Sequence, residues 1–258
     1  PCHGRLPGVT IIDNAVYVNG VRHIEPESLE QTFETLAQHG GMAWIGLYRP
    51  TAEEMAAVAS EFGLHSLAVE DAISAHQRPK LERYEDSLFT VLRPARYLDE
   101  TESVEFGELH IFTGKNYVVT VRHAEMAGVA RVRRRMEARP DLLRHGPEAV
   151  LYALLDRVVD DYAPVVAGLE NDIDEIEDQL FSGDTTVSRR IYELAREVIQ
   201  FQRAIHPLPD MMHQLKRGFE KYGVETDLRH NLRDVEDHVE RVISRADSFR
   251  DLLQNALT

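Results

Sequence analysis

The feature that most constrains this fold is a set of three apolar stripes in the second half of the chain. Each stripe recurs at alternating steps of three and four residues, which is typical of long helices packed side by side. The stripes are Tyr152, Leu155, Val159, Tyr162, Val166, Leu169, Ile173, Ile176 and Leu180; Ile191, Leu194, Val198, Phe201, Ile205, Leu208, Met212 and Leu215; and Leu232, Val235, Val239, Val242, Ala246, Phe249, Leu253 and Ala256. We therefore expect three long helices after residue 124.

Interruptions in the stripes predict where these helices kink or end. Pro164 lies inside the first stripe, and Pro207 and Pro209 lie near the end of the second, so each should break the helical hydrogen-bond ladder. Turn-forming residues predict helix ends at 182–184 and 218–225. The third stripe carries no stop signal, and we expect that helix to continue past the last residue.

The first 123 residues mix strand and helix patterns. An Asn-Gly turn predicts a hairpin over 15–23. Helical spacing predicts a helix over 26–39, with Leu29, Phe33 and Leu36 on one face. A capping-box pair starts another helix at Thr51, and strands are expected over 43–48, 87–97, 104–113 and 116–122. These patterns favour an α+β fold, with an α/β sheet domain covered by helices over 1–123 and a helical region over 124–258.

The charge balance narrows the possible partners. Acidic residues outnumber basic ones 44 to 29, for a net charge of −15. This balance argues against nucleic-acid binding and adhesion to anionic membranes, and it favours cations, metal ions included. One cysteine, Cys2, cannot form an intramolecular disulfide, which indicates a reducing compartment. We expect neither a membrane-spanning segment nor a secretion signal within these residues.

Much of the excess acid lies in one stretch. Residues 147–181 hold ten acidic side chains and one basic side chain, and the simplest interpretation is a solvated helix face. Acids four residues apart on a helix repel one another, so a cation or a basic partner should compensate. We interpret six arginines as this counter-charge rather than as a phosphate site: Arg131, Arg133, Arg134, Arg135, Arg139 and Arg144.

A second acidic group lies on the last helix. Asp234, Asp237 and His238 share one helical face, and oxygen-rich groups suit hard cations such as Mg²⁺. The sequence motifs of zinc peptidases, nucleotide-binding loops and serine hydrolases are absent, so we expect no enzyme.

Two local strings carry a resemblance to a known family. Residues 67–73, with Glu70 and Asp71, are followed by His76-Gln77-Arg78-Pro79-Lys80-Leu81-Glu82 and Tyr84. This pattern resembles the Glu-Asp and Gln-Arg-Pro-Lys signature in the cytosolic domain of CorA-type magnesium/cobalt channels. The similarity continues in order through 151–156, 159–162, 172–174 and 233–238.

The resemblance implies a homopentameric channel whose cytosolic part is this chain. An antiparallel helix pair over about 147–217 and the start of a stalk helix over about 226–258 would follow the sheet domain. Two membrane helices and a Gly-Met-Asn pore loop would follow Thr258. The complete protein would then lie in the cell membrane, with these residues on its cytoplasmic face.

The resemblance also implies a set of ion ligands. A regulatory Mg²⁺, which Co²⁺ or another divalent ion can replace, would bridge Asp71 and the Asp234 of an adjacent subunit. Glu70 and Asp156 correspond to residues near a second ion, and Asp160, Asp237 and His238 are outer-shell candidates. Bound ions would stabilise the closed channel.

Three alternatives stay open at this point. The zinc-transporting branch of the same superfamily shares the architecture. A soluble acidic scaffold could use its helical stripes to bind a protein partner. A metal-dependent enzyme is the third alternative.

Overall fold

The computed structural model describes residues 11–124, 128–182 and 187–256, which belong to two compact units. The sheet unit comprises residues 1–77, 81–91 and 108–154, and the helical unit comprises residues 78–80, 92–107 and 155–258. The chain thus passes between the units more than once. A division into domains at residue 123 stays a prediction.

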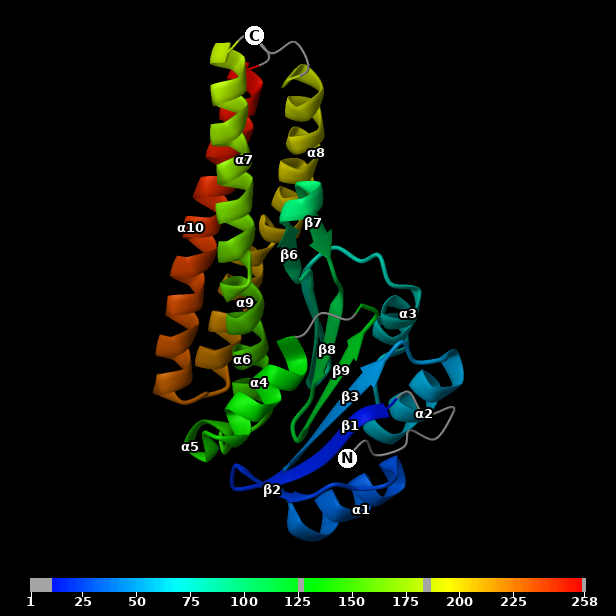
Figure 1. Ribbon diagram of the computed structural model, residues 1–258. Coiled ribbons are helices and arrows are strands. Elements are labelled where there is room, and N and C mark those ends of the chain that lie inside the picture. The colour runs from blue at the N-terminus through cyan, green and yellow to red at the C-terminus, as the bar shows by residue number, and fades with distance from the viewer. Residues whose placement is uncertain (1–10, 125–127, 183–186, 257–258) are drawn as a thin grey trace. The chain divides into compact units, whose positions relative to one another are not determined.

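The sheet unit is built on seven strands in the order β2-β1-β3-β9-β8-β5-β4 (Figure 1). Its strands are β1 (Ile11–Val18), β2 (Val21–Ile24), β3 (Met42–Tyr48), β4 (Lys80–Tyr84), β5 (Ser87–Leu92), β8 (Leu109–Thr113) and β9 (Tyr117–Arg122). β3 pairs with β9 in parallel, whereas β1 runs antiparallel to both β2 and β3, and β8 antiparallel to β9. The predicted hairpin is confirmed, with Asn19 and Gly20 both at positive φ in its turn.

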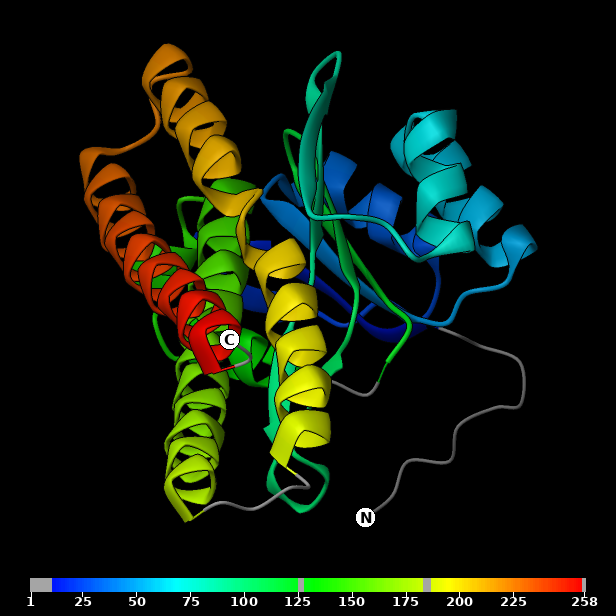
Figure 2. The same ribbon diagram turned by 90° about the horizontal axis from the view of Figure 1, so that it is seen from above.

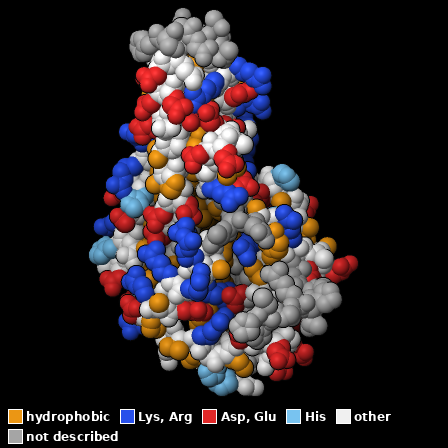
Figure 3. All heavy atoms as spheres, viewed as in Figure 1, with side chains coloured by type: hydrophobic (Ala, Val, Ile, Leu, Met, Phe, Trp, Pro, Cys, Tyr) orange, Lys and Arg blue, Asp and Glu red, His pale blue; other side chains and the backbone are white. Residues whose placement is uncertain are grey.

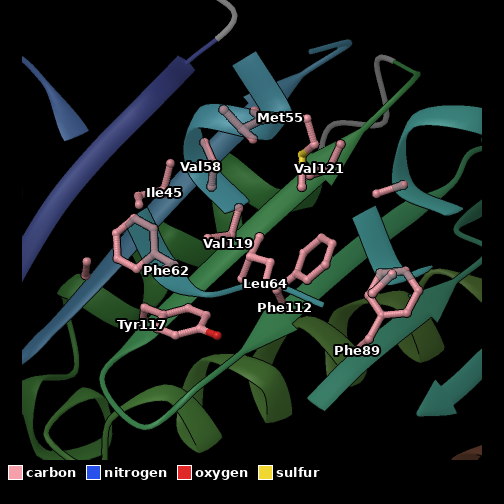
Figure 4. Close-up of a cluster of buried hydrophobic side chains, with 14 of the residues drawn as sticks. Ile45, Met55, Val58, Phe62, Leu64, Phe89, Phe112, Tyr117, Val119 and Val121 are labelled. Carbon is pink, nitrogen blue, oxygen red and sulfur yellow. The ribbon is translucent and has the colours of Figure 1, made fainter. Parts of the chain in front are cut away.

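Three helices pack on one face of this sheet: α1 (Leu29–His39), α2 (Ala52–Phe62) and α3 (Ser66–Ser74). Figure 4 shows the core between them, where Met55, Val58 and Phe62 of α2 meet strand residues such as Ile45 and Val119. The predicted capping box at Thr51 is confirmed: its hydroxyl accepts from the Glu54 amide, and the Glu54 carboxylate accepts from the Thr51 amide. The capping box stabilises the start of α2, and the buried apolar side chains of α2 and α3 pack against the sheet.

The first helix differs from its prediction. It begins at Leu29, after Ser28 as N-cap, and not in the turn that contains Pro26. Phe33 is 52% exposed, whereas Thr32 is buried. Asn14 of β1 accounts for the difference, because its side-chain amide donates to the Thr32 hydroxyl at 2.8 Å and so satisfies a buried polar group.

The opposite face of the sheet carries a buried arginine. α4 (Gly128–Glu137) and α5 (Pro140–Leu143) follow β9 in the chain. The Arg133 guanidinium lies 4.2 Å from the centre of the Trp44 ring, donates to the Trp44 carbonyl at 3.0 Å and pairs with Asp13 at 2.8 Å. The interpretation of Arg133 as counter-charge for the acidic helix is therefore wrong; its carboxylate partner comes from β1.

The helical unit combines a two-stranded sheet with long helices. Its elements are β6 (Ala95–Leu98), the short helix η1 (Asp99–Thr101), β7 (Ser103–Phe106), α7 (Tyr162–Ser182), α8 (Val187–Ile205), α9 (Leu208–Lys221) and α10 (Thr226–Ala256), while α6 (Pro147–Asp160) crosses from one unit to the other. The strands expected over 87–97 and 104–113 therefore each divide in two, between β5 and β6 and between β7 and β8. α10 packs against α7, α8 and α9, and Figure 2 shows it beside α8.

The predicted breaks in the helices are largely confirmed. α6 ends at Asp160 and α7 begins at Tyr162, so the ladder is interrupted just before Pro164. α8 ends at Ile205, and the next helix begins at Leu208. α9, however, continues through Gly218 to Lys221. The break expected at 182–184 lies partly outside the described residues.

Most stripe residues are buried, as the spacing predicts. Along α10 they include Leu232, Val235, Val239 and Phe249. None of the helices in the described part of the chain is both long and apolar enough to cross a membrane. The α+β class is confirmed by the mixed sheet and the helices around it.

Candidate metal centre

The Glu-Asp motif lies on the short helix α3 in the sheet unit. Ala68 and Ala72 face the core, which turns the other side of this helix outward. Glu70 is exposed on that outward side, whereas Asp71 is half-buried and lies beside the buried face, three residues after Ala68. Two large apolar side chains, Leu67 and Ile73, are exposed beside them, at 55% and 38%. The helix thus presents carboxylates and apolar groups together on its surface.

Three of the predicted ligands come together in the helical unit. The stripe on α10 buries Val235 and Val239, so Asp234 and His238 point away from that core. His238 Nδ1 lies 3.5 Å from a carboxylate oxygen of Asp160, and His238 Nε2 lies 3.9 Å from one of Asp234. Both distances exceed that of a hydrogen bond, and the two carboxylates lie at opposite nitrogens of the His238 ring, so the three side chains are neighbours but do not converge on one point.

The other predicted ligands differ in their surroundings. Asp237 is exposed on α10. Asp156 on α6 is only 9% exposed, so it is not a solvated surface acid. Glu70 and Asp71 belong to the sheet unit, whereas Asp156 and the α10 residues belong to the helical unit. Their role as ligands stays a prediction.

An open groove of about 290 Å³ adjoins the cluster within the helical unit. Its floor is apolar, and charged side chains rim it. The lining residues are Val159, Asp160, Ala163, Val166, His238, Arg241, Val242 and Arg245. Asp160 and His238 therefore border a concave surface rather than a flat helix face. Figure 3 shows acidic side chains gathered over the upper part of the helices in this view.

A further acidic cluster was not predicted from the sequence. Carboxylate oxygens of Glu102, Asp172 and Glu175 lie within 4.8 Å of one another, the single such grouping of three or more potential metal ligands in the described parts of the chain. Arg190 occupies this cluster, since its guanidinium pairs with Glu102 at 2.9 Å and with Glu175 at 2.6 Å. The Tyr97 hydroxyl donates to Asp172. The arginine supplies the positive charge that a metal ion would otherwise bring.

The protonation equilibria in this cluster reflect burial and pairing. Burial raises the pKa of Asp172, although the hydrogen bond from Tyr97 and the charge of Arg190 act in the opposite direction. Burial and the same hydrogen bond raise the pKa of Tyr97. The hydrogen bond from Arg190 lowers the pKa of the Glu175 carboxyl. The cluster joins the hairpin of β6 and β7 to α7 and α8.

Sequence reasoning missed this cluster because its members are far apart in the chain. Asp172 appeared as one acid of a helix described as solvated, but it is 4% exposed. The small residue Gly168, one turn earlier, was the available signal. A Cβ at Gly168 would lie 2.2 Å from the Tyr97 ring, so glycine lets that ring reach Asp172.

Comparisons with known proteins agree with this architecture. The family model described as CorA-like Mg2+ transporter protein matches residues 39–258. A putative metal ion transporter of Bacillus subtilis, YfjQ, is 30% identical over 210 residues, which cover 81% of this chain and 64% of the relative. A cobalt/magnesium transport protein CorA of Thermotoga maritima is 27% identical over 198 residues, covering 76% and 56%. The chain thus spans less than two thirds of the length of these two relatives.

Solved structures share the fold. The soluble domain of CorA from Methanocaldococcus jannaschii superimposes with a TM-score of 0.76 at 18% identity, covering 98% of this chain and 97% of that domain. The ZntB cytoplasmic domain from Vibrio parahaemolyticus superimposes less closely, with a TM-score of 0.64 at 11% identity, covering 95% of this chain and 97% of that domain. Both likenesses concern the fold alone.

Proposed function

Because this chain belongs to the CorA-like Mg2+ transporter family, we propose that it is the ion-sensing cytosolic domain of a channel for divalent cations. The carboxylates on α3 and α10 are the observation that carries the proposal. Glu70 is exposed and Asp71 is half-buried on α3 of one unit, and Asp160, Asp234 and His238 are neighbours in the other. The named relatives are transporters, and we propose no reaction for this chain.

In the proposed assembly, five copies form a ring and each interface holds Mg²⁺. Asp71 of one copy and Asp234 of its neighbour would share the regulatory ion. Oxygen donors suit Mg²⁺, which keeps several waters and so needs only one or two carboxylates from protein. Glu70 and Asp156 would lie near a second ion. Asp160, Asp237 and His238 would act through waters in the outer shell, and Co²⁺ could replace Mg²⁺.

Ion binding would act as a gate through electrostatics. With Mg²⁺ present, carboxylates facing each other across the interfaces are neutralised and the closed ring is favoured. When the ion leaves, like charges repel and the ring loosens. The ion shifts the equilibrium only by its difference in affinity for the two states. The conducting part would be membrane helices that follow the position of Thr258, with this domain at the cytoplasmic face.

The proposal is tested by removing both bridging carboxylates. In the 258-residue chain, the double variant Asp71→Asn and Asp234→Asn should lose the increase in melting temperature and in pentamer population caused by millimolar Mg²⁺, because the ion stabilises only the state that binds it. Thermal unfolding and size-exclusion light scattering measure the two effects. A matched control, Glu61→Gln with Asp251→Asn, removes two exposed acids from α2 and α10 and should keep the response.

Other outcomes separate the alternatives. An unchanged Mg²⁺ response in the double variant would refute the site assignment. A response of the parent to Zn²⁺ but not to Mg²⁺ would favour the zinc-transporting branch. A parent indifferent to all divalent ions would favour the protein-binding scaffold.

A further inference from the structure

The helix that carries Glu70 and Asp71 is followed by two strained residues. Ala75 has φ 56° and ψ −165°, a region of backbone conformation that is essentially restricted to glycine. His76 follows with φ 61°. A non-glycine residue adopts such a conformation only where the surrounding contacts impose it. The contacts on either side of this turn must therefore hold it.

On the N-terminal side, the carbonyls of Glu70, Asp71 and Ala72 in α3 accept hydrogen bonds. The Ser74 hydroxyl donates to the Glu70 carbonyl at 2.7 Å, and the Ala75 amide donates to the Asp71 carbonyl at 3.1 Å. His123 Nε2 lies 2.7 Å from the carbonyl oxygen of Ala72. Since a carbonyl can only accept, His123 Nε2 carries the proton and donates it. A side chain from the end of β9 thus binds the end of α3.

On the C-terminal side, the backbone amide of Gln77 donates to the Glu108 carboxylate at 3.1 Å. Glu108 is held in turn by His110 Nε2 at 2.5 Å, and His110 is fully buried. The His110 ring lies edge-on to the His123 ring, with centres 5.7 Å apart. Glu108 and His123, which bind on either side of the turn, are therefore linked to each other through His110.

The sheet explains why Glu108 and His123 act together. β8 and β9 are antiparallel, and Leu109 pairs with Arg122. Glu108 and His123 are each one residue outside that pair, at the same end of the two strands. Their side chains bind the chain at Gln77 and at Ala72, on the two sides of the strained residues. We call these two side chains, Glu108 and His123, the clamp.

This clamp is not the arrangement that would give the greatest stability. Among the residues that the structure describes, His110 Nδ1 is buried without a hydrogen-bond partner. A buried polar atom left unsatisfied is destabilising, and so is the backbone conformation of Ala75. An apolar core and a glycine turn would avoid both, which indicates a role beyond stability.

We propose that Glu108 and His123 are positioning residues for the ion-binding helix: by holding the strained turn, they set the direction in which α3 presents Glu70 and Asp71. The strained turn is connected to the proposed site, because the backbone amide of Ala75 donates a hydrogen bond to the backbone carbonyl of Asp71. Loss of either contact allows the turn to relax and the last turn of α3 to move. This inference rests on the proposed ligand role of Asp71.

The test compares Mg²⁺ sensitivity with stability in the 258-residue chain. Glu108→Ala and His123→Ala should each raise the Mg²⁺ concentration for half-maximal thermal stabilisation about fivefold or more, the usual lower range of coupling between sites. Hydrogen exchange of the peptide 66–77, measured without Mg²⁺, should become faster in both. The control Val16→Ala removes buried apolar atoms from β1, and it should lower the melting temperature without changing the Mg²⁺ midpoint.

Two further variants separate positioning from stability. Glu108→Gln keeps an oxygen acceptor for the Gln77 amide and should keep the midpoint within about twofold of the parent. Ala75→Gly, added to Glu108→Ala, should raise the melting temperature by relieving strain while the midpoint stays high. Recovery of the midpoint together with stability would overturn the proposal.

Other results would also support or reject the positioning role of Glu108 and His123. Unchanged midpoints in Glu108→Ala and His123→Ala, or an equal shift in Val16→Ala, would show that the clamp is only structural. If the parent does not respond to Mg²⁺, the proposed function fails. Hydrogen exchange of the peptide 66–77 then tests only whether Glu108 and His123 hold α3 in place. Faster exchange confined to the clamp variants supports the clamp, and unchanged exchange rejects it.

Discussion

The two units place their candidate ligands by different physical means. α10 is 31 residues long, and its buried stripe fixes which face carries Asp234 and His238. α3 is nine residues long and contributes two buried alanines, so its own sequence fixes little. Its end is held by side chains from the neighbouring strands. A periodic helix thus positions ligands from within, whereas a short helix depends on its tertiary contacts.

The largest expected effect on stability comes from a substitution in the core of the long helices. Phe201 on α8 is fully buried and packs edge-on against Tyr162, with ring centres 5.5 Å apart. Phe201→Ala should lower the free energy of unfolding by about 3–5 kcal/mol, because it leaves a cavity in the helical core. Urea unfolding measures this. Tyr192→Ala, on the same helix but 62% exposed, is the control and should change stability by less than about 0.5 kcal/mol.

A smaller effect should follow from breaking a long-range polar contact in the sheet unit. Arg133→Met keeps much of the side-chain volume but removes the donor to the Trp44 carbonyl and leaves Asp13 paired with Arg22 alone of its two arginine partners. We expect a loss of about 1–3 kcal/mol, since the Trp44 carbonyl loses this buried donor while Arg22 still pairs with Asp13. Arg134→Met, at an exposed position of α4, is the matched control. Equal urea midpoints for the two variants would contradict the anchoring role of Arg133.

The smallest effect concerns the pH dependence of the acidic cluster. Burial raises the pKa of Asp172, so the folded state holds this proton more tightly than the unfolded state does. The stability that Asp172 contributes is therefore present at low pH and lost as pH rises past the ordinary aspartate range near 3.9. The melting temperature of the parent relative to Asp172→Asn should decrease from about pH 4 to about pH 7, by an amount on the order of one degree.

Asp174→Asn, at an exposed position two residues away, is the control for this pH series and should follow the parent throughout. A parent that gains stability relative to Asp172→Asn as pH rises would contradict the direction of the shift. That result would mean that Arg190 outweighs burial at Asp172.

Sequence reasoning succeeded where one local rule decides the structure. The Asn19-Gly20 turn, the capping pair at Thr51 and the helix break before Pro164 each follow from backbone preferences of a few residues. It failed for Phe33, because Asn14 from a distant strand made burial of Thr32 favourable instead. It failed in the same way for Arg133, whose partners are residues of β1 and β3.

The sequence by itself determined the class of fold, the helical stripes and the family, because these depend on periodicity and on ordered strings of residues. Only the tertiary structure decided which acids are buried, that Arg190 pairs with the acids around Asp172, and that Glu108 and His123 bind on either side of the strained turn after α3. Hydrogen bonds and ion pairs between distant segments depend on distances that no local pattern encodes. For the acids counted in the net charge of −15, it is these contacts that set the surroundings of each carboxylate.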